Sequence, residues 1–115
     1  MFGFFKAKPA LGHEQLAHIQ QLRIKGKLHQ AERILLKAEP SPAVADEMRK
    51  IASARAKDAK TQNDWEAVIK YLEQYNSYAQ RVGSHCLKSV NQEPPSHSAS
   101  DIKLLAVAKQ KLALR

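Results

Sequence analysis

The residues of this chain that could do chemistry are few, and their spacing does not bring them together. Cys86 follows His85 directly, and neighbours in an extended segment point in opposite directions, so a nucleophilic cysteine and histidine pair is not indicated. His13 and His18 lie about 140° apart around one expected helix, which is wrong for sharing a metal ion. The chain also lacks a glycine-rich phosphate loop and a zinc-binding pattern. We therefore expect no catalytic residues, metal or cofactor, and a protein that is not an enzyme.

Charge is the strongest pointer to a partner. The 115 residues carry 19 basic and 11 acidic side chains, which gives a formal net charge of +8. A positive field of this size favours an acidic protein segment, nucleic acid or an anionic membrane surface, although charge on solvated helix faces often serves solubility alone. Cys86 is the single cysteine, so no intramolecular disulfide can form and we expect a cytoplasmic protein. We find neither a signal peptide nor a run of about 18 apolar residues that could span a membrane.

The elements that must position these charges are helices. Apolar residues recur at spacings of three and four, and no alternating run of β-branched residues suggests a strand. The pattern predicts an all-α fold with helices at 13–24, 27–39, 42–60 and 65–82 and a last helix that begins at residue 101. We expect an apolar and basic arm at 1–12, a helical domain at 13–83, a flexible loop at 84–97 and a C-terminal helix at 98–115. The arm's phenylalanines, Phe2, Phe4 and Phe5, are expected to pack onto the domain.

Turn and cap residues set these boundaries. Gly26 suits the tight turn between two antiparallel helices, because glycine enters left-handed conformations without steric penalty. Ser41 followed by Pro42 is typical of a helix start, and Asn63 with Asp64 predicts the next turn. Gly83 is expected to end the helix that begins at Trp65.

The chain also contains a weak internal repeat. Gly26 aligns with Asn63 at a period of 37 residues, and the apolar positions that follow align as well. The matched pairs are Leu28 with Trp65, Ala31 with Val68, Leu35 with Leu72, and Ala38 with Tyr75. A period in this range is characteristic of stacked helical hairpins.

These residues resemble the tetratricopeptide repeat, whose second helix opens with glycine and carries a large apolar residue and then alanine, as Gly26, Leu28 and Ala31 do. The resemblance covers residues 13–79. It implies two antiparallel helical hairpins, to which the last helix adds a cap, and a concave groove that binds extended peptides. The alternatives are an unrelated helical bundle and a last helix that docks on another molecule.

In the register of that family, the groove positions come from the first helix of each hairpin. They are His13, Leu16, Gln20, Arg23, Lys50, Ser53, Lys57 and Lys60. We therefore expect an adaptor or chaperone-like interaction module that binds an acidic or extended segment of a partner protein. The alternative is a nucleic-acid-binding accessory protein whose basic side chains contact phosphates: Arg23, Lys25, Lys27, Arg49, Lys50, Arg55, Lys57 and Lys60. The sequence does not indicate an oligomeric state.

Overall fold

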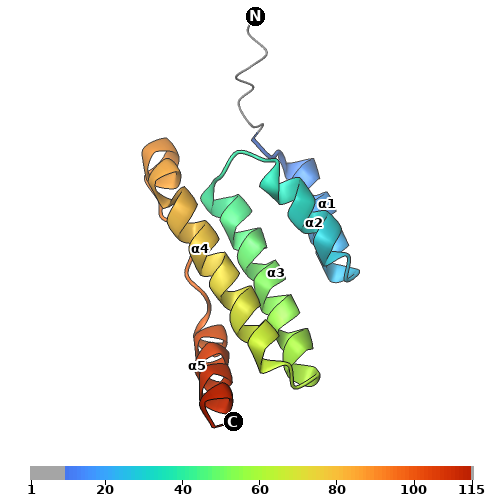
Figure 1. Cartoon of the computed structure of the whole chain (residues 1–115). Coiled ribbons are helices and arrows are strands. Elements are labelled where there is room, and N and C mark those ends of the chain that lie inside the picture. The colour runs from blue at the N-terminus through green and yellow to red at the C-terminus, as the bar shows by residue number, and fades with distance from the viewer. Residues whose placement is uncertain (1–9, 115) are drawn as a thin grey trace, which may run out of the picture.

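The computed structural model describes residues 10–114, and their regular structure is entirely helical. It contains α1 (His13–Ile24), α2 (Leu28–Leu36), α3 (Pro42–Thr61), α4 (Trp65–Val90) and α5 (Ala99–Ala113) (Figure 1). The predicted all-α fold is confirmed, and the arrangement fits two antiparallel hairpins followed by a further helix. The molecule is elongated, with extents of 56 × 30 × 25 Å. The expected packing of Phe2, Phe4 and Phe5 lies outside the described residues.

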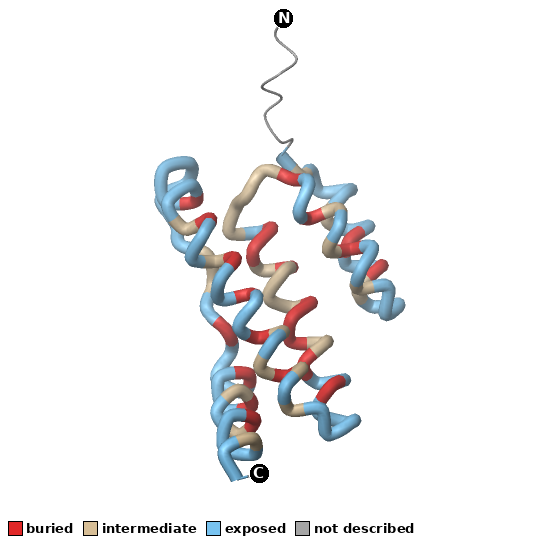
Figure 2. Tube along the Cα trace, viewed as in Figure 1, coloured by how far each residue is buried: buried red, intermediate tan, exposed pale blue. Residues whose placement is uncertain are grey.

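Three clusters of buried side chains form the core. Figure 2 shows buried residues recurring along the helices. The first cluster joins the α1–α2 hairpin to α3: Ile19, Leu22, Ala31, Leu35, Ala38, Val44 and Ile51. The second lies between α3 and the later part of α4: Ala45, Ala52, Tyr75, Tyr78, Val82 and Cys86. The third joins α3, the start of α4 and α5: Ala56, Ala59, Val68, Leu72, Leu104 and Ala108. The alanines on α3 let the neighbouring helices approach closely.

The turns at Gly26 and Asn63 have the same geometry. Both residues are left-handed, with φ of 81° and 56°, as glycine and asparagine tolerate better than other residues. The N–H of Lys27 donates to the Leu22 carbonyl at 2.8 Å, and the N–H of Asp64 donates to the Ala59 carbonyl at 2.9 Å. Each bond spans five residues, so the two turns have equivalent hydrogen bonding.

Side chains cap the helices that follow. The Ser41 hydroxyl accepts a bond from the N–H of Val44 at 3.1 Å, and Pro42 occupies the first turn of α3. At the start of α5, the Ser98 hydroxyl accepts from the N–H of Asp101 at 3.3 Å. The Ser41 cap agrees with the predicted start of α3, whereas α5 begins at Ala99, two residues before the predicted start at residue 101. Both hydroxyls satisfy N–H groups that have no partner within the helix.

The predicted end of α4 at Gly83 is wrong, and so is the predicted loop over residues 84–90. The helix continues to Val90 because Val82 and Cys86 extend its buried stripe into the second cluster. Asn91, with φ of 54°, supplies the left-handed cap that Gly83 was expected to give. At the other hairpin, α2 ends at Leu36, three residues before the predicted end at Glu39.

Because α4 is continuous, Gly83 lies in the interior of a helix, where alanine should be more stabilising than glycine. A Cβ atom added at this position would meet no other atom within 4 Å, and the backbone there is not left-handed. We therefore expect Gly83→Ala to raise the free energy of unfolding by about 1 kcal/mol, measured by urea denaturation. A destabilised Gly83→Ala variant would show that the helix breaks at this residue.

The segment between α4 and α5 is held against α4. The Tyr75 hydroxyl donates to the carbonyl of Pro95, and the buried His97 donates through Nε2 to the Leu72 carbonyl at 2.7 Å. The rings of Tyr75 and His97 also meet edge to face, with their centroids 5.0 Å apart. These contacts bring α5 back along α4, where it packs within its own chain.

Candidate partner-binding groove

A cavity of about 340 Å³ opens where the end of α1, the middle of α3 and the start of α5 meet. We call it the inner groove. Its lining consists of Arg23, Arg49, Lys50, Ser53, Ala54, Lys57, Ser98 and Asp101. The lining residues therefore come from α1 and α3, which are the first helices of the two hairpins, and from the start of α5.

The structure brings together half of the predicted groove positions. Arg23, Lys50, Ser53 and Lys57 line the inner groove. Gln20 lies beside it and reaches α3 through a hydrogen bond, whereas Leu16 is half-buried on α1 outside the lining. His13 and Lys60 are exposed and do not line the groove, because they lie at the far ends of α1 and α3.

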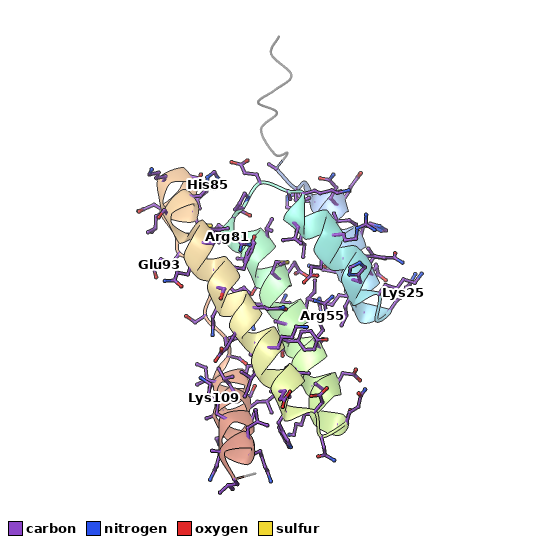
Figure 3. The ribbon with its side chains drawn as sticks, in the orientation of Figure 1. Lys25, Arg55, Arg81, His85, Glu93 and Lys109 are labelled. Atoms are coloured by element: carbon purple, nitrogen blue, oxygen red, sulfur yellow. The ribbon has the colours of Figure 1, made fainter. Side chains whose placement is uncertain are left out.

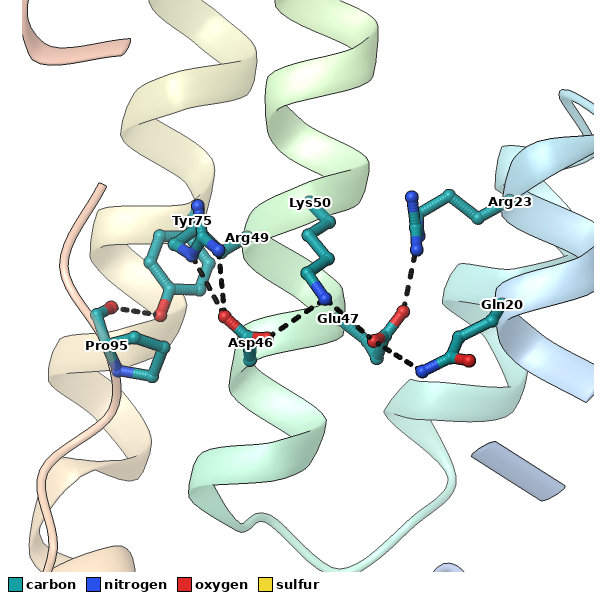
Figure 4. Close-up of polar contacts among 8 residues, drawn as sticks. All are labelled: Gln20, Arg23, Asp46, Glu47, Arg49, Lys50, Tyr75 and Pro95. Atoms are coloured by element: carbon teal, nitrogen blue, oxygen red, sulfur yellow. Dashed lines mark hydrogen bonds and ion pairs between the residues drawn. The ribbon is translucent and has the colours of Figure 1, made fainter. Parts of the chain in front are cut away.

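A buried carboxylate connects the two helices beneath this lining. The Glu47 side chain is only 4% exposed, and it accepts from Arg23 Nε at 3.3 Å. It also accepts from Gln20 Nε2 and from Lys50 Nζ, each at 3.5 Å. Figure 4 shows these contacts running from α1 to α3. Such a carboxylate fixes the position of the cations around it, because an unpaired charge could not stay buried.

Asp46 extends this network toward α4. Its carboxylate accepts from Arg49 Nη2 at 2.9 Å and pairs with Lys50 Nζ at 3.3 Å (Figure 4). Burial by itself would raise the pKa of Asp46, but the hydrogen bonds from Arg49 and Lys50 outweigh it and lower this pKa. Asp46 is therefore ionised at neutral pH and holds both cations in place.

The α5 side of the groove is closed by a buried hydrogen bond. The Ser53 hydroxyl donates to Asp101 Oδ1 at 3.0 Å, and Asp101 is 2% exposed. A negative charge in the first turn of a helix is favoured by the helix dipole, which explains why a carboxylate can be buried there.

The groove keeps only a small excess of positive charge. Four cationic side chains line it: Arg23, Arg49, Lys50 and Lys57. Three carboxylates stand against them: Asp46, Glu47 and Asp101. Lys57 is exposed and has no ion pair within residues 10–114, so its ammonium group is open to a ligand.

Sequence reasoning missed the three acidic residues of this site. Glu47 lies three positions before Lys50 and Asp46 four, which are the spacings of helical ion pairs and could have signalled both contacts. Asp101 gave no such signal, because its burial depends on how α5 returns onto α3.

The basic residues outside the inner groove do not form one continuous patch with it. Arg55 pairs with Glu32 Oε2 at 2.8 Å and lies 5.6 Å from the centre of the Tyr71 ring, in a separate cavity between α2 and α4. Figure 3 shows Lys25, Arg55, Arg81 and Lys109 on different parts of the molecule. The positive charge is therefore distributed over the molecule.

The described residues with nucleophilic or acid-base character do not converge. Cys86 is fully buried, and burial raises the pKa of its thiol. His85 contacts Glu39 Oε1 and Ser89 Oγ, both at 3.3 Å, but through the same nitrogen, Nε2. A serine, histidine and carboxylate relay needs the two ring nitrogens separately. No group of three or more potential metal ligands occurs among the described residues.

Comparison of the chain with protein-family models, curated proteins and solved structures gives no match. Within residues 10–114, no helix has both the length and the apolar character needed to cross a membrane.

Proposed function

We propose that the chain is a non-enzymatic interaction module that binds an acidic, extended segment of a partner protein in the inner groove. The observation that carries this proposal is the convergence of Arg23, Lys50, Ser53 and Lys57 in one cavity. The equivalent turns at Gly26 and Asn63 and the sequential packing of the helices support a tetratricopeptide-like arrangement. A cytoplasmic location fits this role and remains a prediction.

The donors that are available in the groove suit carboxylates. Glu47 engages Arg23 through Nε, so the outer guanidinium nitrogens can still donate to a ligand. Lys57 adds an unpaired ammonium group on α3. A segment that crosses from α1 to α5 would meet both groups, and an extended chain would reach both without folding first.

Lys57 and Lys60 provide a matched pair for testing the groove. Both are exposed on α3, three residues apart, but only Lys57 lines the cavity. We expect Lys57→Glu to weaken binding of a labelled glutamate-rich peptide about tenfold, because a like charge faces the ligand directly. Lys60→Glu changes the net charge equally and should weaken binding much less, as measured by fluorescence anisotropy. Equal losses in the two variants would contradict binding in this groove.

The competing class of partner is nucleic acid, which the net charge of +8 favours. The same anisotropy measurement on a labelled single-stranded oligonucleotide separates the two. Phosphate binding declines steeply and linearly with salt on logarithmic axes and would respond equally to Lys57→Glu and Lys60→Glu. Tight oligonucleotide binding of that kind, with no peptide binding, would replace the interaction-module proposal.

A further inference from the structure

Glu47 contacts two of the cations that would bind a partner's carboxylates, Arg23 and Lys50, although it does not itself line the inner groove. Its oxygens accept from Arg23 and Gln20 on α1 and from Lys50 on α3, and its side chain is 4% exposed. The chain therefore supplies its own acidic group to the cations of the inner groove, from beneath. We infer that Glu47 is an internal competitor that sets how acidic a partner must be, an inference that rests on the proposed function.

The charges around the groove show why one carboxylate matters. Four cations line the groove with Asp101, and Asp46 and Glu47 pair with these cations from outside the lining, so the seven charged side chains together have a net charge of one positive unit. Neutralising Glu47 alone would double that excess. Because Glu47 is buried, its field is screened by solvent less than the field of the half-exposed Asp46.

The same arrangement specifies the chemistry of the partner. A single carboxylate would meet a groove whose cations are mostly occupied, and it would gain little beyond the Lys57 ammonium group. Consecutive carboxylates could engage Lys57 and the outer nitrogens of Arg23 at once, and share Lys50, whose side chain is 36% exposed. The partner class is therefore a segment with several consecutive acidic residues.

A second interhelical ion pair that involves α3 provides the control for Glu47. Glu32 and Arg55 join α2 to α3 at 2.8 Å, just as Glu47 and Arg23 join α1 to α3 at 3.3 Å. Arg55 lines other cavities and does not line the inner groove. Glu32→Gln therefore removes one negative charge and one interhelical ion pair without altering the groove.

The test is the affinity of the full chain for a labelled peptide of consecutive glutamates, measured by fluorescence anisotropy at low salt. We expect Glu47→Gln, which keeps the shape of the side chain, to bind this peptide about tenfold more tightly than the wild type. Glu32→Gln should gain much less. A peptide with glutamine in place of glutamate should bind weakly to every variant.

A purely structural role for Glu47 predicts the opposite result, because loosening α1 from α3 would weaken binding. Glu47→Gln that binds the acidic peptide no more tightly than Glu32→Gln would overturn the inference and leave the proposed function standing. Failure of the wild type and all variants to bind would instead overturn the proposed function. Asp46→Asn is a second variant, at a half-exposed position, that should give a smaller gain, and circular dichroism verifies that each variant is folded.

Discussion

Replacing Leu72 with alanine is expected to lower the free energy of unfolding by about 3 kcal/mol, which is the cost of a large cavity in a packed core. Leu72 is fully buried in the third cluster, where α3, α4 and α5 meet. Its carbonyl also accepts the His97 Nε2 bond that holds the linker to α5. Urea denaturation measures the loss of unfolding free energy. Hydrogen exchange should show weaker protection of the backbone amides in α5.

Leu87 on the same helix serves as the control for Leu72. It is 44% exposed, so Leu87→Ala should cost only about 0.5 kcal/mol. Similar losses for the two variants would mean that α5 and α3 do not enclose Leu72 as described.

The second large effect is alkaline destabilisation through Tyr75. Burial raises the pKa of Tyr75 to about 12, from an ordinary value of 10.0. The folded state therefore keeps the phenol proton at a pH where the unfolded chain has lost it. Stability from this residue is complete below pH 10 and falls as the pH rises toward 12, by about 2 to 3 kcal/mol in all. Urea denaturation at a series of pH values measures this loss.

Tyr75→Phe identifies the source of the alkaline effect. Phenylalanine keeps the ring in the second cluster but removes the ionisable hydroxyl and its bond to the Pro95 carbonyl. This variant should lose about 1 kcal/mol at neutral pH and then show a shallower alkaline decline than the wild type. Burial also raises the pKa of Tyr78, so a part of the decline should remain. An identical alkaline decline in both proteins would assign the effect to other residues.

Local signals in the sequence predict most of this fold. The serine caps, the proline after Ser41 and the left-handed residues at Gly26 and Asn63 act within a few positions of one another, so their consequences can be read without the tertiary structure. The end of α4 could not be read in this way. A glycine at a plausible terminus was overridden by the burial of Cys86 against another helix, which is a tertiary effect.

The groove positions that the tetratricopeptide resemblance implies include three of the four cations in the cavity, Arg23, Lys50 and Lys57. Arg49 also lines the cavity but was not among those positions, and Lys60 was among them but lies outside. The burial of Glu47 depends on the distance between α1 and α3, and the contact of Asp101 depends on the path of residues 91–98. The spacing of residues along the chain determines neither the distance between α1 and α3 nor the path of residues 91–98.

Of the five described helices, α3 alone contributes side chains to all three core clusters. The α1–α2 hairpin packs into the first of these clusters alone, and the ion pairs of Arg23 and Glu32 add polar links from it to α3. We therefore expect local opening to begin with this hairpin, because the other two clusters join only α3, α4 and α5. In that partly open form the inner groove loses Arg23 and the wall that α1 provides. A ligand that binds across the proposed groove would therefore stabilise the hairpin against opening, because it would bind the closed form and not the open one.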